Sequence, residues 1–314
     1  MKTKNTRDLL QNNVQKVMVG CSWPTDLLWM SILVNGHVLL EDVPGTGKTT
    51  LAKTIAKSLD LSFNRIQFTP DVVPTDVIGV NMYHQNKNEF EFKKGSVFSH
   101  LILADEINRA TPRTQSALLE AMEERQVTSD SITYQLPEPF FVMATQNPIE
   151  STGTFPLPEA QIDRFMVRMS LGYPTLEEEV NMLMMHSAKK VLDEVEAVCS
   201  KEDILECQKE CEQVTIHQDL VEYIVRLAKA TRKHPQVAIG VSPRAALGMV
   251  KCAKAYAAIQ GRNYVLPDDI KTLVPYVFAH RMQTNHYSFT QDNDVQKILK
   301  DILAEVEVPV EDIK

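Results

Sequence analysis

The sequence lacks long apolar runs, basic clusters and a signal peptide. Its longest apolar runs, such as residues 101–104, are far too short to cross a bilayer. The polar stretch at residues 1–8 has no apolar signal core. The formal net charge is -8, and no Lys/Arg cluster offers an electrostatic surface for nucleic acid or an anionic membrane. We therefore expect a soluble, cytoplasmic protein that spans no membrane and binds no nucleic acid.

Cysteines are also few, and the five present match neither a disulfide framework nor a zinc site. Cys207 and Cys211 lie four residues apart, so on a helix they would share a face, as a two-cysteine metal clip requires. No His or Cys partner stands at zinc-ligand spacing nearby. Free thiols in a reducing compartment are the favoured interpretation.

The chain of 314 residues is long enough for about two domains, and its two halves differ. Residues 1–172 alternate short apolar runs, at 37–40, 101–104 and 140–144, with helical stretches. Such runs between helices indicate a parallel sheet, which predicts an α/β domain with helices on both faces. Residues 173–314 show helical spacing and caps but no convincing strand, which predicts a smaller all-helical lid. Tyr173-Pro174 is the predicted hinge, because the residue before proline resists helix.

A glycine-containing loop follows the first apolar run and ends at Gly47-Lys48-Thr49. Strand, loop and GK[ST] opening a helix is the arrangement of a P-loop, whose backbone N–H groups cradle phosphates. Lys48 would reach the β- and γ-phosphates, and the Thr49 hydroxyl can ligate Mg²⁺. Asp42 stands where the full pattern has glycine, so an incidental match in a strand–helix turn is the alternative. The predicted nucleotide-binding residues of the loop are Val43, Pro44, Gly45, Thr46, Gly47, Lys48, Thr49 and Thr50.

Polar residues end two further apolar runs. Asp105 and Glu106 follow residues 101–104, as in a Walker B motif. Asp105 would hold Mg²⁺ together with Thr49, and Glu106 would orient and polarise the attacking water. Asn147 follows the run at 140–144, and its amide could hold that water, although Asn147-Pro148 also favours a turn. Two surface carboxylates after a strand are the alternative for the acidic pair.

Together with Asp163-Arg164-Phe165 and Ser242-Pro243-Arg244, these motifs resemble those of the AAA+ ATPases. The local sequence is most similar to that of the MoxR branch. The resemblance covers about residues 19 to 281. The segments that carry it are LEDVPG at 40–45, QFTPD at 67–71, ADEINRA at 104–110, QSALLEAMEERQV at 115–127, ATQNP at 144–148 and LPEAQIDRF at 157–165. The segment at 20–24 departs from the branch, where relatives usually carry Gly-Gln near the adenine.

The resemblance implies roles for three side chains. Asn147 matches sensor 1, Arg164 resembles an arginine finger that reaches a neighbouring subunit's γ-phosphate, and Arg244 resembles sensor 2 on the lid and would contact nucleotide. Each arginine has a surface ion pair as its alternative. The family also carries hairpins, which would fit at about 81–92, as an insert in the second helix, and at about 127–134, before sensor 1. Ordinary decorated loops are the alternative for both.

The resemblance implies Mg-dependent ATP hydrolysis, with ATP and Mg²⁺ as cofactors, by a ring that is usually a hexamer. Such proteins act like chaperones, maturing or inserting cofactors into partner complexes that often carry von Willebrand factor A domains. A nucleic-acid-linked motor is an alternative, against which the acidic balance argues. A nucleotide-gated signalling switch with little turnover is another, against which Glu106, Asn147 and Arg164 argue.

Overall fold

A five-stranded sheet forms the centre of the molecule, in a computed structural model that describes residues 1–43, 45–147, 153–186, 191–285 and 291–309. The strand order is β2-β5-β8-β1-β9, and all neighbouring strands run parallel. The strands are β1 (Val38–Glu41), β2 (Phe63–Gln67), β5 (Leu101–Asp105), β8 (Phe141–Gln146) and β9 (Val167–Met169). The predicted α/β class with a parallel sheet is thus confirmed.

The three apolar runs predicted as strands are β1, β5 and β8, and they occupy the inner positions of the sheet. The sequence analysis did not identify β2 and β9, which form the two edges. Of the β2 residues only Ile66 is buried, and β9 is three residues long. Neither strand therefore has the continuous apolar run that marks a strand buried on both faces.

Helices cover both faces of the sheet, because alternate side chains of each strand point to opposite sides. Leu101 and Leu103 of β5 belong to one apolar cluster with Leu51 and Ile55, whereas Ile102 belongs to a second cluster. The first cluster lies under α1 (Lys2–Val17), α2 (Ser22–Leu33) and α3 (Lys48–Ser58), and the second under α4 (Pro74–Ile78) and α5 (Pro112–Glu124).

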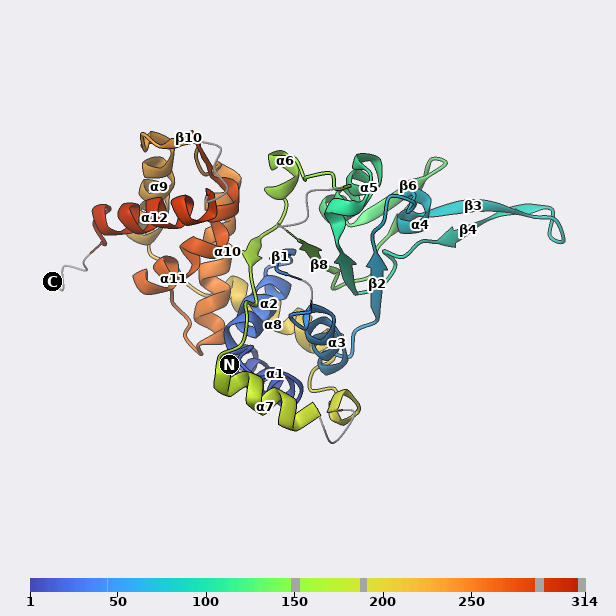
Figure 1. Ribbon diagram of the computed structural model, residues 1–314, viewed down its shortest axis with the longest axis horizontal. Coiled ribbons are helices and arrows are strands. Elements are labelled where there is room, and N and C mark those ends of the chain that lie inside the picture. The colour runs from blue at the N-terminus through green and yellow to red at the C-terminus, as the bar shows by residue number, and fades with distance from the viewer. Residues whose placement is uncertain (44, 148–152, 187–190, 286–290, 310–314) are drawn as a thin grey trace.

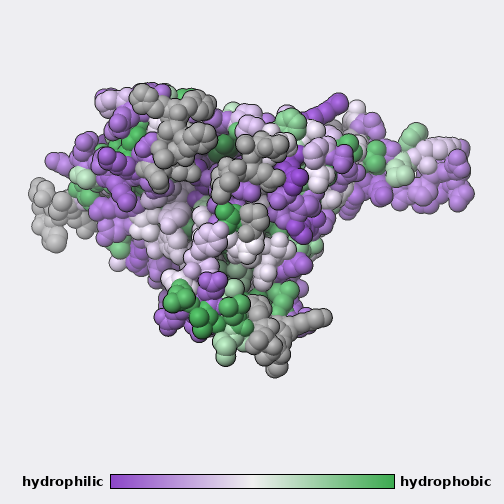
Figure 2. Space-filling model, in the orientation of Figure 1, coloured by the Kyte–Doolittle hydropathy of each residue, from purple (hydrophilic) through white to green (hydrophobic). Residues whose placement is uncertain are grey.

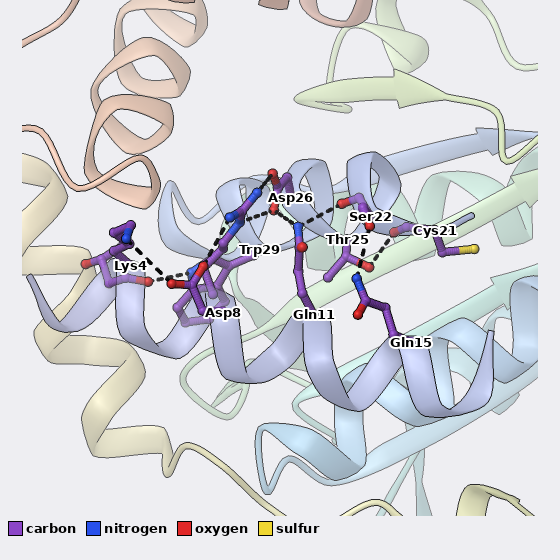
Figure 3. Close-up of polar contacts among 11 residues, drawn as sticks. Lys4, Asp8, Gln11, Gln15, Cys21, Ser22, Thr25, Asp26 and Trp29 are labelled. Carbon is purple, nitrogen blue, oxygen red and sulfur yellow. Dashed lines mark hydrogen bonds and ion pairs between the residues drawn. The ribbon is translucent and has the colours of Figure 1, made fainter. Parts of the chain in front are cut away.

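Helices α1 and α2 are joined through a buried carboxylate (Figure 3). Arg7 donates from Nε and Nη2 to the two oxygens of Asp26 at 2.7 and 2.6 Å, and Gln11 donates to the same carboxylate at 2.6 Å. Asp26 is 4% exposed. The bidentate partner makes this burial tolerable, because an isolated buried charge is strongly destabilising.

The C-terminal half is helical, as predicted. Ser242 caps α10 by accepting a hydrogen bond from the Ala245 N–H at 3.2 Å, and Gly261 follows the helix at φ +82°. The helices are α7 (Leu176–His186), α8 (Lys201–Gln213), α9 (Gln218–Lys233), α10 (Pro243–Ile259), α11 (Pro267–Val277) and α12 (Gln291–Glu305), with short 3₁₀ turns at Val191–Glu194 and Ala279–Arg281. The structure adds a small antiparallel pair, β10 (Val237–Ile239) and β11 (Gln283–Thr284), which is too short for a sequence pattern to reveal.

The two halves share one apolar cluster. It includes Leu10 of α1, Leu28 of α2 and Leu51 of α3 together with Cys207 of α8 and Met249 of α10. The N-terminal helices therefore pack against both the sheet and the helices of the C-terminal half. The predicted domain boundary between residues 172 and 173 stays a prediction.

Helix α7 leaves an apolar face in contact with solvent. Leu176, Val180, Leu183 and Met184 recur at helical spacing and are 81%, 52%, 63% and 71% exposed. Figure 2 shows hydrophobic residues gathered at the lower edge of the molecule, where α7 lies in Figure 1. A contiguous patch of this kind is typical of a surface that contacts another protein.

Two hairpins extend from the side of the sheet that α4 and α5 cover. The longer one pairs β3 (Gly79–His84) with β4 (Glu89–Lys94) and projects far from the body (Figure 1), while the shorter one pairs β6 (Gln126–Ser129) with β7 (Ile132–Gln135). They contact each other where Phe92 and Tyr134 stack at 4.0 Å between ring centroids. They cover the segments 81–92 and 127–134 for which hairpins were expected, and their assignment as family inserts stays a prediction.

Within the described ranges, no helix combines the length and apolar character needed to cross a membrane. The five cysteines are buried thiols, and burial raises the pKa of Cys199 and Cys252 to about 12, which makes them poor nucleophiles. In the same part of the chain, no group of three or more His, Cys, Asp or Glu side chains could hold a metal ion.

Candidate functional site

The loop between β1 and α3 has the backbone of a phosphate cradle. Gly45 and Gly47 adopt φ +89° and +88°, a left-handed conformation that glycine adopts without strain. A side chain at Gly45 would meet nothing within 4 Å, so the loop stands clear of the protein there. Helix α3 begins at Lys48, and its first N–H groups have no partner within the helix. The loop therefore offers an anion-binding site.

A pocket of about 370 Å³ opens beside this loop. It gathers the ends of β2, β5 and β8 next to the start of α3, as expected for ligands at the carboxyl ends of parallel strands. Its lining residues are Gly45, Gly47, Lys48, Thr49, Thr50, Arg65, Gln67, Asp105, Glu106 and Asn147. Most of the predicted site thus lies in one place. Val43 and Thr46 belong to the loop but not to this lining, and Pro44 lies outside the described residues.

Asp42, the residue that departs from the P-loop pattern, has a structural role. The Asp42 carboxylate is buried and accepts hydrogen bonds from the Ser170 hydroxyl at 2.8 Å and from the backbone N–H groups of Leu171 and Gly172 at 2.6 and 3.2 Å. It thereby fixes the segment that leaves β9. The backbone carbonyl of Asp42 accepts a hydrogen bond from Lys48 Nζ at 2.9 Å, which holds the lysine side chain beside the loop.

Both oxygens of Asp105 have partners at the end of β5. Oδ1 accepts from the Thr145 hydroxyl at 2.7 Å. Oδ2 accepts from Arg65 Nε at 3.1 Å and from Arg65 Nη2 at 2.6 Å. Only 12% of the Asp105 side chain is exposed, against 44% for that of Arg65. The carboxylate expected to hold magnesium is therefore held by an arginine that the sequence analysis did not identify.

Glu106 adopts an uncommon backbone conformation for a residue with a side chain, with φ 55° and ψ 50°. Strain of this kind is often found at functional sites. Its N–H donates to the Thr145 hydroxyl at 2.9 Å. Its Oε2 accepts from Gln67 Nε2 at 2.8 Å and from Arg109 Nη1 at 3.2 Å. The fully buried Thr145 hydroxyl therefore contacts both acidic residues at once.

Asn147 directly follows β8 and lines the same pocket. The backbone carbonyl of Asn147 accepts a hydrogen bond from Asn108 Nδ2 at 3.5 Å. The predicted sensor-1 residue thus lies in the same lining as Glu106, as a water-positioning role requires.

The two predicted arginines lie together, away from the phosphate pocket. Arg164 Nε is 3.0 Å from Oε2 of Glu123, and Arg244 Nη2 is 3.1 Å from Oε1 of the same carboxylate. All three side chains line a second cavity of about 320 Å³, which shares no lining residue with the first. Glu123 was not identified from the sequence, because nothing distinguishes it there from the other acidic residues of α5.

The segment after α1 adjoins the loop on its other side. A Cβ at Gly47 would lie 2.7 Å from Met18 Cε, and one at Gly20 would lie 2.6 Å from a carboxylate oxygen of Glu178 on α7. Trp23 packs edge-on against Tyr256 and Tyr276 of the C-terminal helices. An adenine-side role for residues 20–23 stays a prediction.

Comparisons with known proteins agree with this geometry. The family model described as "ATPase family associated with various cellular activities (AAA)" matches residues 37–167, and the AAA lid domain model matches residues 229–302. The chain is 46% identical to the uncharacterized protein YeaC of Bacillus subtilis over 95% of this chain and 93% of that protein. It is 40% identical to Chaperone MoxR1 of Mycobacterium tuberculosis, over 94% and 80% of the two chains.

The fold also resembles that of a solved structure. A crystal structure of a candidate ATPase from Cytophaga hutchinsonii superposes with a TM-score of 0.89 at 41% sequence identity. The match covers 98% of this chain and 97% of that one, so it includes both the sheet and the C-terminal helices.

Proposed function

Because this chain belongs to the MoxR family of AAA+ ATPases, we propose that it binds ATP with magnesium in the phosphate pocket and hydrolyses the ATP. The observation that carries the proposal is the convergence of Lys48, Thr49, Asp105, Glu106 and Asn147 on one pocket. Phosphoryl transfer needs groups that bind phosphate, hold a metal and position water, and these side chains have the chemistry for each task.

The donor set fits both the nucleotide and the metal. The left-handed glycines and the start of α3 present N–H groups to an anion, next to the Lys48 ammonium. Mg²⁺ in nucleotide sites uses one or two protein oxygens, phosphates and water, and the Thr49 hydroxyl and Asp105 carboxylate line the same pocket. When bound, the metal neutralises charge on the phosphates.

In the proposed reaction, different residues of the chain bind the phosphates and position the water. Lys48 exchanges the Asp42 carbonyl for the β- and γ-phosphates, with further loop contacts proposed for Val43, Pro44, Thr46 and Thr50. Glu106 orients and polarises the attacking water, and the Asn147 amide holds that water against the γ-phosphate.

Arg164 and Arg244 act, in this proposal, on the nucleotide of a neighbouring subunit. The support is their common contact with Glu123 and the separation of their cavity from the phosphate pocket of the same chain. Two guanidinium groups presented side by side can neutralise transition-state charge on a γ-phosphate from outside. Glu123 keeps them together while that phosphate is absent.

A site completed by a neighbour requires an oligomer, and we propose a ring, hexameric as in the family. The ring would reshape a separate protein client in the manner of a chaperone, which the name of the relative Chaperone MoxR1 supports. A client with a von Willebrand factor A domain, and a role in cofactor maturation, belong to the same proposal.

The experiment is steady-state ATP hydrolysis against protein concentration. For the wild type we expect a specific activity that rises with concentration, because assembly completes each site. Arg164→Ala should lose turnover while nucleotide still binds, and the exposed Arg226→Ala on α9 is the matched control with unchanged turnover. A flat, Arg164-independent rate would exclude the shared site.

A second pair of variants separates binding from chemistry. Glu106→Gln should bind ATP but barely turn over, because an amide cannot accept the proton of the attacking water. Lys48→Ala should lose nucleotide binding itself. Full activity in Glu106→Gln would show that another group activates the water.

A further inference from the structure

A buried arginine of the lid contacts the segment that carries Arg164. Arg281 ends the 3₁₀ turn that follows α11, within the part of the chain that the AAA lid model matches. Only 4% of its side chain is exposed, and its Nε forms an ion pair with Oδ1 of Asp163 at 2.8 Å. A charge buried this deeply is tolerated only beside a partner of opposite charge. The pair therefore joins the lid to the residue that precedes Arg164.

The same guanidinium holds the backbone on both sides of Arg164. Its Nη2 donates to the carbonyl of Asp163 at 3.2 Å and to that of Phe165 at 2.7 Å. The Phe165 carbonyl also accepts a hydrogen bond from His280 Nε2 at 3.0 Å. The guanidinium Nη1 donates to the carbonyl of Val277, the last residue of α11, at 2.8 Å. The peptide groups that flank Arg164 are thus fixed relative to α11.

Helix α10 approaches the same segment with the face that carries Arg244. A Cβ at Gly248 would lie 3.0 Å from Met166 Sδ and 3.9 Å from Arg281 Nη1. Gly248 stands about one helical turn after Arg244, so the two residues share a face of α10. Arg164, Arg244 and Arg281 all line the second cavity. Arg281 therefore lies where the two elements that carry the predicted nucleotide-contacting arginines meet.

The side-chain contact of Arg164 is not enough to fix its position. Its ion pair with Glu123 joins side chains that are 30% and 35% exposed, and such a pair contributes little energy. Once a phosphate takes the place of Glu123, the position of the guanidinium depends on the backbone that carries it. Catalysis by a positioned group is sensitive to small displacements, so a firmly held backbone matters for turnover.

We propose that Arg281 is a positioning residue for Arg164, because it fixes the peptide groups on both sides of Arg164 and so sets where this arginine enters the nucleotide site of the next subunit. Arg281 belongs to the lid, so the position of the lid in one subunit sets the arginine that serves its neighbour. This inference rests on the proposed ATP site shared between subunits.

The first test separates turnover from binding. Arg281→Lys keeps a cation beside Asp163, but one ammonium cannot hold the carboxylate and both flanking carbonyls at once. We expect kcat to fall roughly ten- to hundredfold, because a displacement of about 1 Å can cost that much. The KM for ATP should change less than about twofold, since the phosphate pocket is intact. A folded variant with turnover close to that of the wild type would refute the proposal.

Arg262→Lys is the matched control within the lid. Arg262 donates from Nη1 and Nη2 to the carboxylate of Asp269 at 2.9 and 2.6 Å, and from Nη1 to the carbonyl of Tyr264 at 3.0 Å. The Arg262–Asp269 pair lies outside the linings of the phosphate pocket and of the second cavity. We expect a lower thermal midpoint but unchanged turnover. An equal loss of turnover in the two variants would refute the proposal, because it would show that any loosening of the lid has this effect.

A mixing experiment shows on which subunit Arg281 acts. Glu106→Gln subunits lack the water-activating carboxylate but keep Arg281 and Arg164, whereas Arg281→Lys subunits have the reverse defect. In an equimolar mixture, half of the subunits keep Glu106, and half of these receive Arg164 from a Glu106→Gln neighbour. Turnover should therefore reach about a quarter of the wild-type value. A merely structural role would leave the mixture no more active than its separate components, and that result would refute the proposal.

A second mixture, of Arg164→Ala with Glu106→Gln, distinguishes the two levels of the argument. Turnover that returns there but not with Arg281→Lys would refute the inference alone. Turnover that returns in neither mixture would overturn the shared site, and the inference with it. If Arg281→Lys does not fold, Asp163→Asn replaces it, since it keeps the size of the side chain and removes the charge that pairs with Arg281. The same loss and the same return of turnover are then expected, and their absence would refute the proposal.

Discussion

Replacing Thr145 by valine should destabilise the protein far more than the loss of one hydroxyl ordinarily does. Valine is β-branched like threonine and has nearly its shape, so the packing at this fully buried position is largely kept. The hydroxyl donates to the Asp105 carboxylate at 2.7 Å and accepts from the Glu106 N–H at 2.9 Å. Both partners would lose a hydrogen bond in a buried setting, where water does not easily replace it.

The magnitude follows from the two bonds. A hydrogen bond to a charged group contributes roughly 1.5–3 kcal/mol and one between neutral groups roughly 0.5–1.5 kcal/mol. We expect the free energy of unfolding of Thr145→Val to fall by about 2–4 kcal/mol, because the donor to a charged carboxylate dominates. Glu106 would also lose the contact that holds its left-handed backbone, so turnover should fall while nucleotide binding at Lys48 persists.

The assay is urea unfolding at pH 7 in the absence of nucleotide, with the free energy taken from the midpoint and slope. Thr54→Val on α3 is the matched control, since Thr54 is equally buried but donates only to the Thr50 carbonyl, at 2.9 Å, within its own helix. We expect less than about 1 kcal/mol there. Equal losses in the two variants would refute the reasoning, because they would show that the bridging hydroxyl adds nothing beyond an ordinary buried threonine.

Three further predictions concern the scaffold. Arg7→Ala leaves the 4%-exposed Asp26 without its cation and should destabilise the protein by about 3–5 kcal/mol, measured by urea unfolding; Arg7→Lys should cost less. Burial lowers the pKa of His37 to about 3, so between pH 6.5 and 3 the unfolded state binds a proton on this side chain that the folded state does not. The free energy of unfolding should therefore fall by up to about 1.4 kcal/mol per pH unit as the pH drops through this range. An NMR titration that shows His37 protonated at pH 5 in the folded protein would contradict this. Gly95→Ala should destabilise by roughly 1–3 kcal/mol or more, because its Cβ would lie 2.3 Å from the Gly79 nitrogen, and an unchanged thermal midpoint would count against that clash.

Local sequence patterns were sufficient to predict those parts of the site and fold whose residues are neighbours in the chain. The phosphate loop needs glycines, a lysine and a helix start within a few residues, so 45–49 could be interpreted without any tertiary information. The same holds for the apolar runs of β1, β5 and β8, and for the Ser-Pro pair at 242–243 that opens α10. The edge strand β2 escaped notice because an edge position tolerates polar residues, and with it Arg65 and Gln67 were missed.

The sequence by itself determined the α/β class, the helical C-terminal half and the residue types of the candidate site. These depend on short-range periodicity and on motifs whose members are neighbours in the chain. Only the tertiary structure decided that Arg65 holds Asp105, that Thr145 bridges the acidic pair, and that Glu123 holds Arg164 beside Arg244. Those pairs are separated by 39 residues or more, and strand register and helix packing, which no local pattern encodes, bring them within hydrogen-bond distance.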